Sequence, residues 1–239
     1  MESLVQKVDT SRVKTRYLYG EAEKLQSPGL IYGLEVDDKK RMSCSYDQLA
    51  RQNGRTLYLD NSNTYGMSYE YLPGAQMGTT TTLVASVTNG NQKLSYTYDE
   101  LGNINTIAEN GVVKVYYIYD ELNQLVRENN LWEGKTICYT YDAGGNMTAR
   151  KDYTYTLSTP GTLQKQILYT YGNANWKDQL TAYNGQAITY DGMGNPLSYR
   201  GMTMTWQKGR ELKQIVKDGK TITYAYDNEG IRVGKTVDG

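Results

Sequence analysis

The stretch Tyr96-Thr97-Tyr98-Asp99-Glu100-Leu101-Gly102-Asn103-Ile104 recurs, with variations, along this 239-residue chain. Its second aromatic residue returns at positions 98, 119, 141, 190 and 226, so that the first two intervals are 21 and 22 residues. A period of this length is typical of one supersecondary unit that is repeated and that depends on its neighbours for burial. The sequence therefore predicts a repeat array.

Each copy has the pattern of a strand followed by a turn. Tyr-x-Tyr places both rings on the same face of a strand, because side chains alternate with a period of two. The Asp that follows accepts hydrogen bonds from backbone N–H groups two residues on and begins a turn. We expect Gly to supply a positive φ and Asn to tolerate one, before an apolar residue begins the return strand. The segment thus predicts a hairpin turn of four to five residues.

A second, tighter kind of turn separates consecutive copies. Two-residue signals of the Asn-Gly type stand at 89–90, 110–111, 133–134, 184–185, 200–201 and 218–219. These dipeptides favour type I′ hairpins. Alternating long and tight turns predict an all-β antiparallel meander, with roughly fourteen strands of five to nine residues between 92 and 237. A sheet of so many strands is expected to curl into a spiral or hollow shell wall.

The repeat motif defines the residues to which we assign a structural role. They are the aromatic pairs, the turn-forming Asp and the Gly and Asn that follow: Tyr96, Tyr98, Asp99, Gly102, Asn103, Tyr117, Tyr119, Asp120, Tyr139, Tyr141, Asp142, Gly145, Asn146, Tyr190, Asp191, Gly194, Asn195, Tyr224, Tyr226, Asp227 and Gly230.

The regularity of the repeats varies along the chain. Residues 90–239 carry the regular copies, whereas residues 1–89 carry divergent ones with longer loops expected at 21–29 and 73–79. Residues 151–168 predict an elongated hairpin that projects beyond the rim, and 21–25 a single helical turn. No stretch has the composition of a linker, so we expect one array over 1–239.

Composition narrows the classes of function. The 26 basic and 26 acidic residues balance, which argues against nucleic-acid binding. The chain has no His, so the usual general base and imidazole ligand are missing. Cys44 and Cys138 lie far apart and predict packed free thiols. No apolar stretch is long enough to span a membrane, and the first residues lack a signal-peptide core.

The remaining candidate sites favour structure over chemistry. Each repeated Asp is alone in its turn, whereas calcium sites cluster several oxygen donors, so we predict no metal and no cofactor. No pair of carboxylates stands out, so we predict no enzyme. The Tyr rows suit cross-strand packing better than sugar stacking. Trp132 and Trp176 lie near turns and are better candidates for exposure, although packing is expected there too.

At these repeats the chain resembles the Rhs/YD-repeat family, which includes Rhs polymorphic toxins, wall-associated repeat proteins, Tc toxin C components and teneurins. The copies at 96–104, 117–125, 139–147 and 224–232 fit its pattern closely. The resemblance implies a β-sheet that spirals into a hollow shell around a C-terminal toxin and is closed by a plug module. In many members that module cleaves itself at an Asp-Pro motif. This chain has no Asp-Pro, so we expect no toxin or plug module within 1–239, and no protease role is carried onto Asp227 or Asp238.

The resemblance implies a structural, non-catalytic fragment of an encapsulating shell, in a secreted or surface-delivered bacterial protein. Its partners would be the downstream plug module and the toxin cargo of the same polypeptide. The alternative is an adhesin-like module that binds glycans or a cell surface through its loops. Polar residues opposite the Tyr rows would favour a shell, and aromatic residues in loops 153–168 or 172–180 a binding module. The open sheet edges also predict edge-to-edge self-association.

Overall fold

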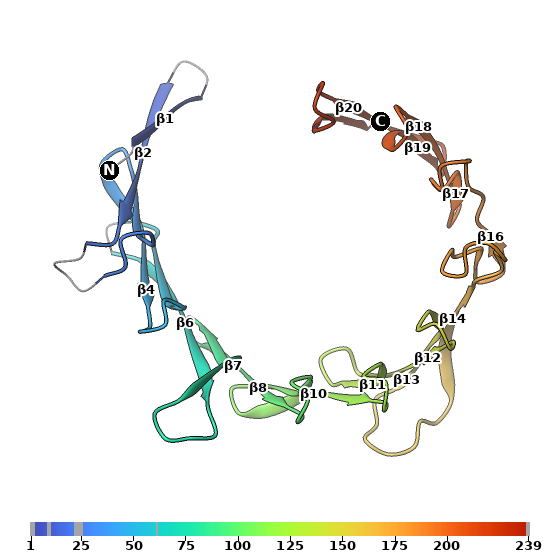
Figure 1. Ribbon diagram of the computed structural model, residues 1–239, viewed down its shortest axis with the longest axis horizontal. Helices are drawn as coiled ribbons and strands as arrows, with labels where there is room; N and C mark the ends of the chain where they lie inside the picture. The colour runs from blue at the N-terminus through green and yellow to red at the C-terminus, as the bar shows by residue number, and fades with distance from the viewer. Residues whose placement is uncertain (1–2, 9–10, 22–25, 61, 238–239) are drawn as a thin grey trace. The chain divides into compact units, whose positions relative to one another are not determined.

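The computed structural model describes residues 3–8, 11–21, 26–60 and 62–237, and within these it consists of strands and turns without a helix. The chain divides into two compact units, 1–117 and 118–239, and the boundary falls within one strand. The predicted helical turn at 21–25 lies largely outside the described residues, and so does Asp238. Figure 1 shows successive hairpins along the ribbon.

In the first unit each strand pairs antiparallel with the strand that follows it in the sequence. The strands are β1 (Ser3–Val8), β2 (Ser11–Tyr19), β3 (Ile31–Val36), β4 (Lys39–Tyr46), β5 (Gln52–Tyr58), β6 (Thr64–Pro73), β7 (Thr80–Asn89), β8 (Gln92–Tyr98), β9 (Ile104–Glu109) and β10 (Val112–Tyr119), which contains the boundary.

The second unit continues the same order in two sheets, one ending at β16 and one running from β17 to β21. Its strands are β11 (Leu125–Asn130), β12 (Lys135–Tyr141), β13 (Met147–Thr154), β14 (Leu163–Thr170), β15 (Ala182–Tyr183), β16 (Gln186–Ala187), β17 (Ser198–Tyr199), β18 (Met202–Gln207), β19 (Glu211–Lys217), β20 (Lys220–Tyr226) and β21 (Arg232–Val237). The predicted all-β antiparallel meander is confirmed.

Three strands are shorter than the predicted five to nine residues. β15, β16 and β17 contain two residues each. Two features of the sequence limit pairing here: an eleven-residue loop, 171–181, precedes β15, and Pro196 follows a turn. Proline has no N–H to give to a ladder, so only an isolated bridge forms between Tyr190 and Pro196.

The tight turns follow the prediction in part. Both central residues have positive φ at Asn110-Gly111, Asn184-Gly185, Arg200-Gly201 and Asp218-Gly219, as type I′ turns require. The turn predicted at 89–90 instead uses Gly90 and Asn91, because Asn89 pairs with Gln92 and ends β7. A turn of the same kind at Asp37-Asp38, with φ of 50° and 58°, was not expected.

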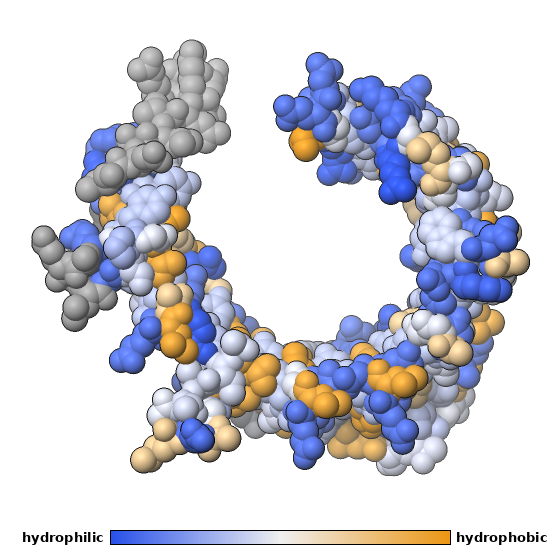
Figure 2. All heavy atoms as spheres, viewed as in Figure 1, coloured by the Kyte–Doolittle hydropathy of each residue, from blue (hydrophilic) through white to orange (hydrophobic). Residues whose placement is uncertain are grey.

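The sheet is thinly buried. Six apolar side chains of the described residues are less than 9% exposed, among them Val115 in the first unit and Ile137 and Ala149 in the second. The chain exposes 16178 Å², whereas a compact monomer of 27.0 kDa would expose about 10,800 Å². On the face that Figure 2 shows, apolar and hydrophilic side chains alternate along the ribbon. Within each of the two units, much of the sheet therefore has no second layer.

β13 and β14 pair antiparallel across the loop 155–162, which lies within the hairpin expected at 151–168. The loop also forms hydrogen bonds with the strands before it. The Arg127 Nη2 donates to the carbonyl oxygens of Thr156 (2.9 Å) and Ser158 (2.6 Å), and the Thr136 hydroxyl donates to the Thr156 oxygen. Thr136 and Asn129 are consequently buried, at 0% and 3% exposed. The bonds to the loop add to the one that the Arg127 Nε donates to Asn129, and they give the buried Thr136 hydroxyl an acceptor.

Candidate functional site

The Tyr-Asp turns are built around the carboxylate. In the copy at 99–103, one oxygen of Asp99 (Oδ1) accepts from the backbone N–H groups of Leu101 (3.0 Å) and Asn103 (2.8 Å). The Asp99 N–H donates in turn to the Asn103 oxygen at 2.9 Å. The carboxylate therefore satisfies N–H groups that the turn removes from the ladder. The same contacts, to the residues two and four positions on, recur at Asp47, Asp120, Asp142, Asp191 and Asp227.

The Asn of the motif has a role that the sequence analysis missed. The positive φ lies at the Gly position alone, at 85° for Gly102, 84° for Gly145, 82° for Gly194 and 79° for Gly230. The Asn side chain instead donates to the second carboxylate oxygen (Oδ2), as Asn103 does to Asp99 at 2.9 Å. Asn146 and Asn195 make the same contact with Asp142 and Asp191, at 3.1 and 2.8 Å.

These hydrogen bonds stabilise the charged carboxylates. The Asn side chain, followed by backbone N–H groups, holds the pKa of Asp99, Asp142 and Asp191 below the usual range of an Asp. Both oxygens of each carboxylate are already engaged. Such groups are poorly suited to accept a substrate proton or to ligate a metal, and well suited to fix a turn.

In eight copies the second aromatic ring links one turn to the turn before it. The Tyr141 hydroxyl donates to the Leu125 carbonyl oxygen at 2.8 Å, and Leu125 directly follows the preceding turn. The equivalent bonds join Tyr46 to Ile31, Tyr71 to Gln52, Tyr98 to Val84, Tyr171 to Met147, Tyr190 to Leu180 and Tyr226 to Leu212. Trp206, where Trp replaces Tyr, keeps the bond through its Nε1, which donates to Pro196 at 2.7 Å.

The first aromatic ring of each pair has no such common partner. The Tyr139 hydroxyl donates to Glu128 at 3.2 Å, and burial, followed by the charge of Glu128, raises the Tyr139 pKa. Tyr224 has the guanidinium of Arg232 over its ring at 5.4 Å. Tyr96 lies two residues before Tyr98 in β8, and Tyr117 and Tyr119 lie at the end of β10. These rings pack on the sheet rather than form a site for chemistry.

A β-bulge accompanies the turns and was also not predicted. Tyr98 pairs with Ile104 and Thr97 with Thr106, so that one residue of the return strand is left over. The register shifts in the same way at Tyr46, Tyr141, Trp206 and Tyr226. A bulge increases the right-handed twist of its strand. The repeat therefore sets a local twist as well as a turn.

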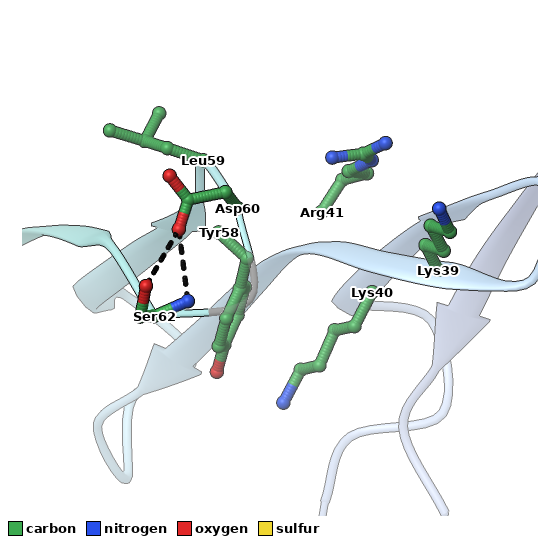
Figure 3. A pocket seen from close by; sticks show the side chains of 7 residues that line it. All are labelled: Lys39, Lys40, Arg41, Tyr58, Leu59, Asp60 and Ser62. Carbon is green, nitrogen blue, oxygen red and sulfur yellow. Dashed lines mark hydrogen bonds between the residues drawn. The ribbon is translucent and has the colours of Figure 1, made fainter.

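A shallow pocket of about 430 Å³ lies between β4 and the loop after β5 (Figure 3). Three neighbouring basic residues line the pocket, although the chain as a whole has no net charge. The Lys40 Nζ lies 4.7 Å from the Tyr58 ring centroid. The Asp60 carboxylate accepts from Ser62 and Asn63, which lowers its pKa to about 2. The lining residues are Lys39, Lys40, Arg41, Tyr58, Leu59, Asp60 and Ser62. They can attract an anion, but they do not pair a nucleophile with a base.

Other chemistry is sparse in the described part of the chain. Within it, no group of three or more His, Cys, Asp or Glu is placed to hold a metal ion. Cys44 and Cys138 are free and half-buried, and burial raises the pKa of the Cys138 thiol. No described helix is long and apolar enough to cross a bilayer.

Comparison with known proteins agrees with this geometry. The chain is 39% identical over 121 residues to the tRNA nuclease WapA of Bacillus subtilis (strain 168), and equally to the tRNA3(Ser)-specific nuclease WapA of Bacillus spizizenii. Its fold matches a chain of the crystal structure of TcdB2-TccC3, with a TM-score of 0.69 and 18% identity over 95% of this chain. The predicted YD-repeat resemblance is thereby confirmed. A second structure, TcdB2-TccC3-TEV, matches 93% with a TM-score of 0.68.

The shared regions are small parts of the larger proteins. The matched residues are 49% of this chain and 5% of each WapA protein. The chain spans 13% of the matched chain of TcdB2-TccC3 and 12% of that of TcdB2-TccC3-TEV. No protein-family model matches the chain. The likeness to WapA concerns sequence and the likeness to TcdB2-TccC3 concerns the fold.

Proposed function

We propose that residues 1–239 are one continuous stretch of a β-sheet wall that encloses another part of the polypeptide to which they belong. The observation that carries this proposal is the thin sheet, which exposes 16178 Å² where about 10,800 Å² is ordinary for its mass. A sheet of this kind, joined turn to turn by hydroxyl–carbonyl bonds, forms a surface rather than a compact domain. The fold match to TcdB2-TccC3 supports the proposal.

The face opposite the Tyr rows suits the inside of a container. In β8 and β9 it carries Thr97 and Thr106, whose hydroxyl oxygens lie 2.6 Å apart. In β12 and β13 it carries Thr140 and Thr148, with hydroxyls 3.0 Å apart. These threonine hydroxyls form hydrogen bonds with each other, and at these positions an enclosed unfolded chain would find few apolar contacts. Such a lining confines a cargo without binding it tightly.

The contents and the closing module would lie elsewhere in a longer protein. The WapA relatives are named as tRNA nucleases, and the matched stretch is 5% of their length. We propose that the corresponding protein carries a toxin cargo and a plug module outside 1–239, and that it is secreted or delivered at the bacterial surface. This stretch then contributes containment and no catalysis.

A second candidate function is recognition of glycans or of a cell surface. Trp176 in loop 171–181 and Trp132 in the turn 131–134 are 51% and 48% exposed. Exposed indole rings in loops are typical of stacking platforms for sugars. The observation is narrower than the one that favours a wall, because it concerns two residues rather than the whole sheet.

Protease protection tests the proposal in the full-length protein that carries this stretch. Limited proteolysis should leave the enclosed segment intact while exposed loops such as 74–79 are cut. Inserting a specific protease site into 74–79, where Met77 is fully exposed, and cleaving there should open the wall and make the enclosed segment sensitive. An enclosed segment digested as fast as the same segment expressed alone would contradict containment. Binding of the intact protein to a glycan array, lost on changing Trp176 to Ala, would instead favour recognition.

A further inference from the structure

The Tyr-Asp turns of the second unit form a continuous ridge. It consists of the turns 120–124, 142–146, 191–195, 207–211 and 227–231, together with the loop 171–181, and we call it the turn ridge. Each member contacts the next. Asn146 donates to Asp178 at 3.2 Å and Asn195 to the Gly209 oxygen at 2.6 Å. A Cβ built on Gly145, Gly209 or Gly230 would lie within 3.8 Å of a side chain from the preceding turn of the ridge.

The turn ridge presents apolar side chains to solvent. Leu122 is 74% exposed, Met193 58%, Ile231 60% and Trp176 51%. The Trp176 ring packs over Gly194, where a Cβ would lie 2.8 Å from it. The Trp176 backbone N–H donates to the Asn173 side chain. Single exposed apolar residues are ordinary. Here they lie on four of the six members of the ridge, and successive members are two strands, or about 9.6 Å, apart.

We propose that the turn ridge binds the turn ridge of a second copy of this chain, packed antiparallel around Trp176. A row of turns with a fixed spacing fits best against a row with the same spacing, and a second copy of the chain has the same row of turns. A two-fold interface requires only that the surface be complementary to itself. The proposal concerns the ridge and is independent of what the sheet encloses.

The side chains of the ridge select one register. With Trp176 on the two-fold axis, the turn 142–146 of one copy faces the turn 191–195 of the other. Gly144 has no side chain and leaves room for Met193. The next pair brings the exposed Glu121 opposite the exposed Lys208 and Arg210.

The competing register is disfavoured by charge. If the two-fold axis instead lay midway between the loop 171–181 and the turn 191–195, the turn 120–124 would face the turn 227–231. Glu121 would then oppose Glu229, and both are exposed. Like charges placed opposite each other destabilise an interface. Charge therefore favours the arrangement centred on Trp176.

The size of the ridge predicts a weak dimer. With Trp176 on the axis, the members from 120–124 to 207–211 face the partner; they span four intervals, or about 38 Å, and the edge of a single sheet is about 10 Å wide. Each copy then contributes roughly 400 Å², which is below the usual size of a stable interface. We expect a dissociation constant in the micromolar range, on the order of 10–100 µM.

Sedimentation equilibrium of the 239-residue chain between about 1 and 200 µM tests the proposal. The wild-type chain should dimerise, and Trp176→Ala should weaken dimerisation by about tenfold or more, as for a central aromatic anchor. Trp132→Ala is the matched control, because Trp132 has nearly the same exposure but lies on the opposite edge of the sheet. Circular dichroism checks that both variants keep the strand content of the wild type.

A charge-reversal cycle tests the register. Glu121→Lys and Arg210→Glu should each weaken the dimer, and the double variant should restore part of the lost affinity, because the Glu121–Arg210 pair is inverted while Lys208 is unchanged. Three results would overturn the proposal: a monomer throughout the range, association unchanged by Trp176→Ala, and no rescue in the double variant. Association through open strand edges would give the second result. A glycan that quenches Trp176 in a monomeric chain would also overturn it.

Discussion

Removing one hydroxyl group from Tyr98 tests whether the second ring of each repeat fastens a turn to its predecessor. The Tyr98 hydroxyl donates to the Val84 oxygen at 2.7 Å, and burial raises the Tyr98 pKa. Tyr98→Phe keeps the ring and deletes the bond. A neutral hydrogen bond of this kind contributes about 1 kcal/mol, and the carbonyl left half-buried adds to the cost.

The effect should be local rather than global. In a repeat array each unit is stabilised mainly by its nearest neighbours, so a lost contact loosens the units that share it. A loss of about 1 kcal/mol raises the opening equilibrium about fivefold. Amide hydrogen exchange should therefore be about fivefold faster in the turn 99–103 and the adjoining ends of β8 and β9, and unchanged near β12.

Tyr96→Phe is the matched control in the same strand. Tyr96 lies on the same face two residues earlier, and the linking bond comes from Tyr98. Its substitution should change the local opening free energy by less than about 0.5 kcal/mol. Equal acceleration of exchange in Tyr96→Phe and Tyr98→Phe would refute the reasoning, since ring packing and not the hydroxyl bond would then hold the turn.

Further predictions concern the turns and the folded-back loop. Asn103 lowers the folded-state pKa of Asp99, so the Asp99 carboxylate contributes stability above about pH 4 and loses that contribution as the pH falls through the lowered pKa. Asn103→Ala should raise the Asp99 pKa, and NMR titration of the carboxyl carbon would show the change. Gly102→Ala should cost about 1–2 kcal/mol through φ alone, whereas Gly194→Ala should cost more in denaturant unfolding and shift tryptophan fluorescence, because its Cβ would meet an indole ring. Arg127→Gln should free the loop 155–162 and speed its cleavage by protease, with no change if the loop is held by other contacts.

The sequence predicted the features of this fold that depend on local chemistry. Tyr-x-Tyr, the Asp turn and the Asn-Gly turns act within a few residues, so strand order and antiparallel pairing could be derived from them. The hydroxyl bond of Tyr141 to Leu125 joins residues 16 apart and depends on the register of two strands. The fold-back of loop 155–162 onto Arg127 likewise depends on which side chains lie across the sheet, which no local pattern encodes.

The sequence predicted which residues form the turns, but not every hydrogen bond that they make. The Asp, Gly and aromatic residues of the turns were assigned from their turn chemistry. The Asn was assigned a backbone role, whereas its side chain holds the carboxylate. The signal was present, since Asn follows Asp by four residues in three copies. The charge at Lys39-Lys40-Arg41 was passed over because the overall charge is balanced.

The most direct test of the wall is a cryo-electron microscopy map of the full-length protein that carries residues 1–239. The account predicts that this stretch forms part of a closed sheet, with density for another segment of the chain against the face that bears Thr97 and Thr140. A sheet with solvent on both faces and no enclosed chain would contradict it.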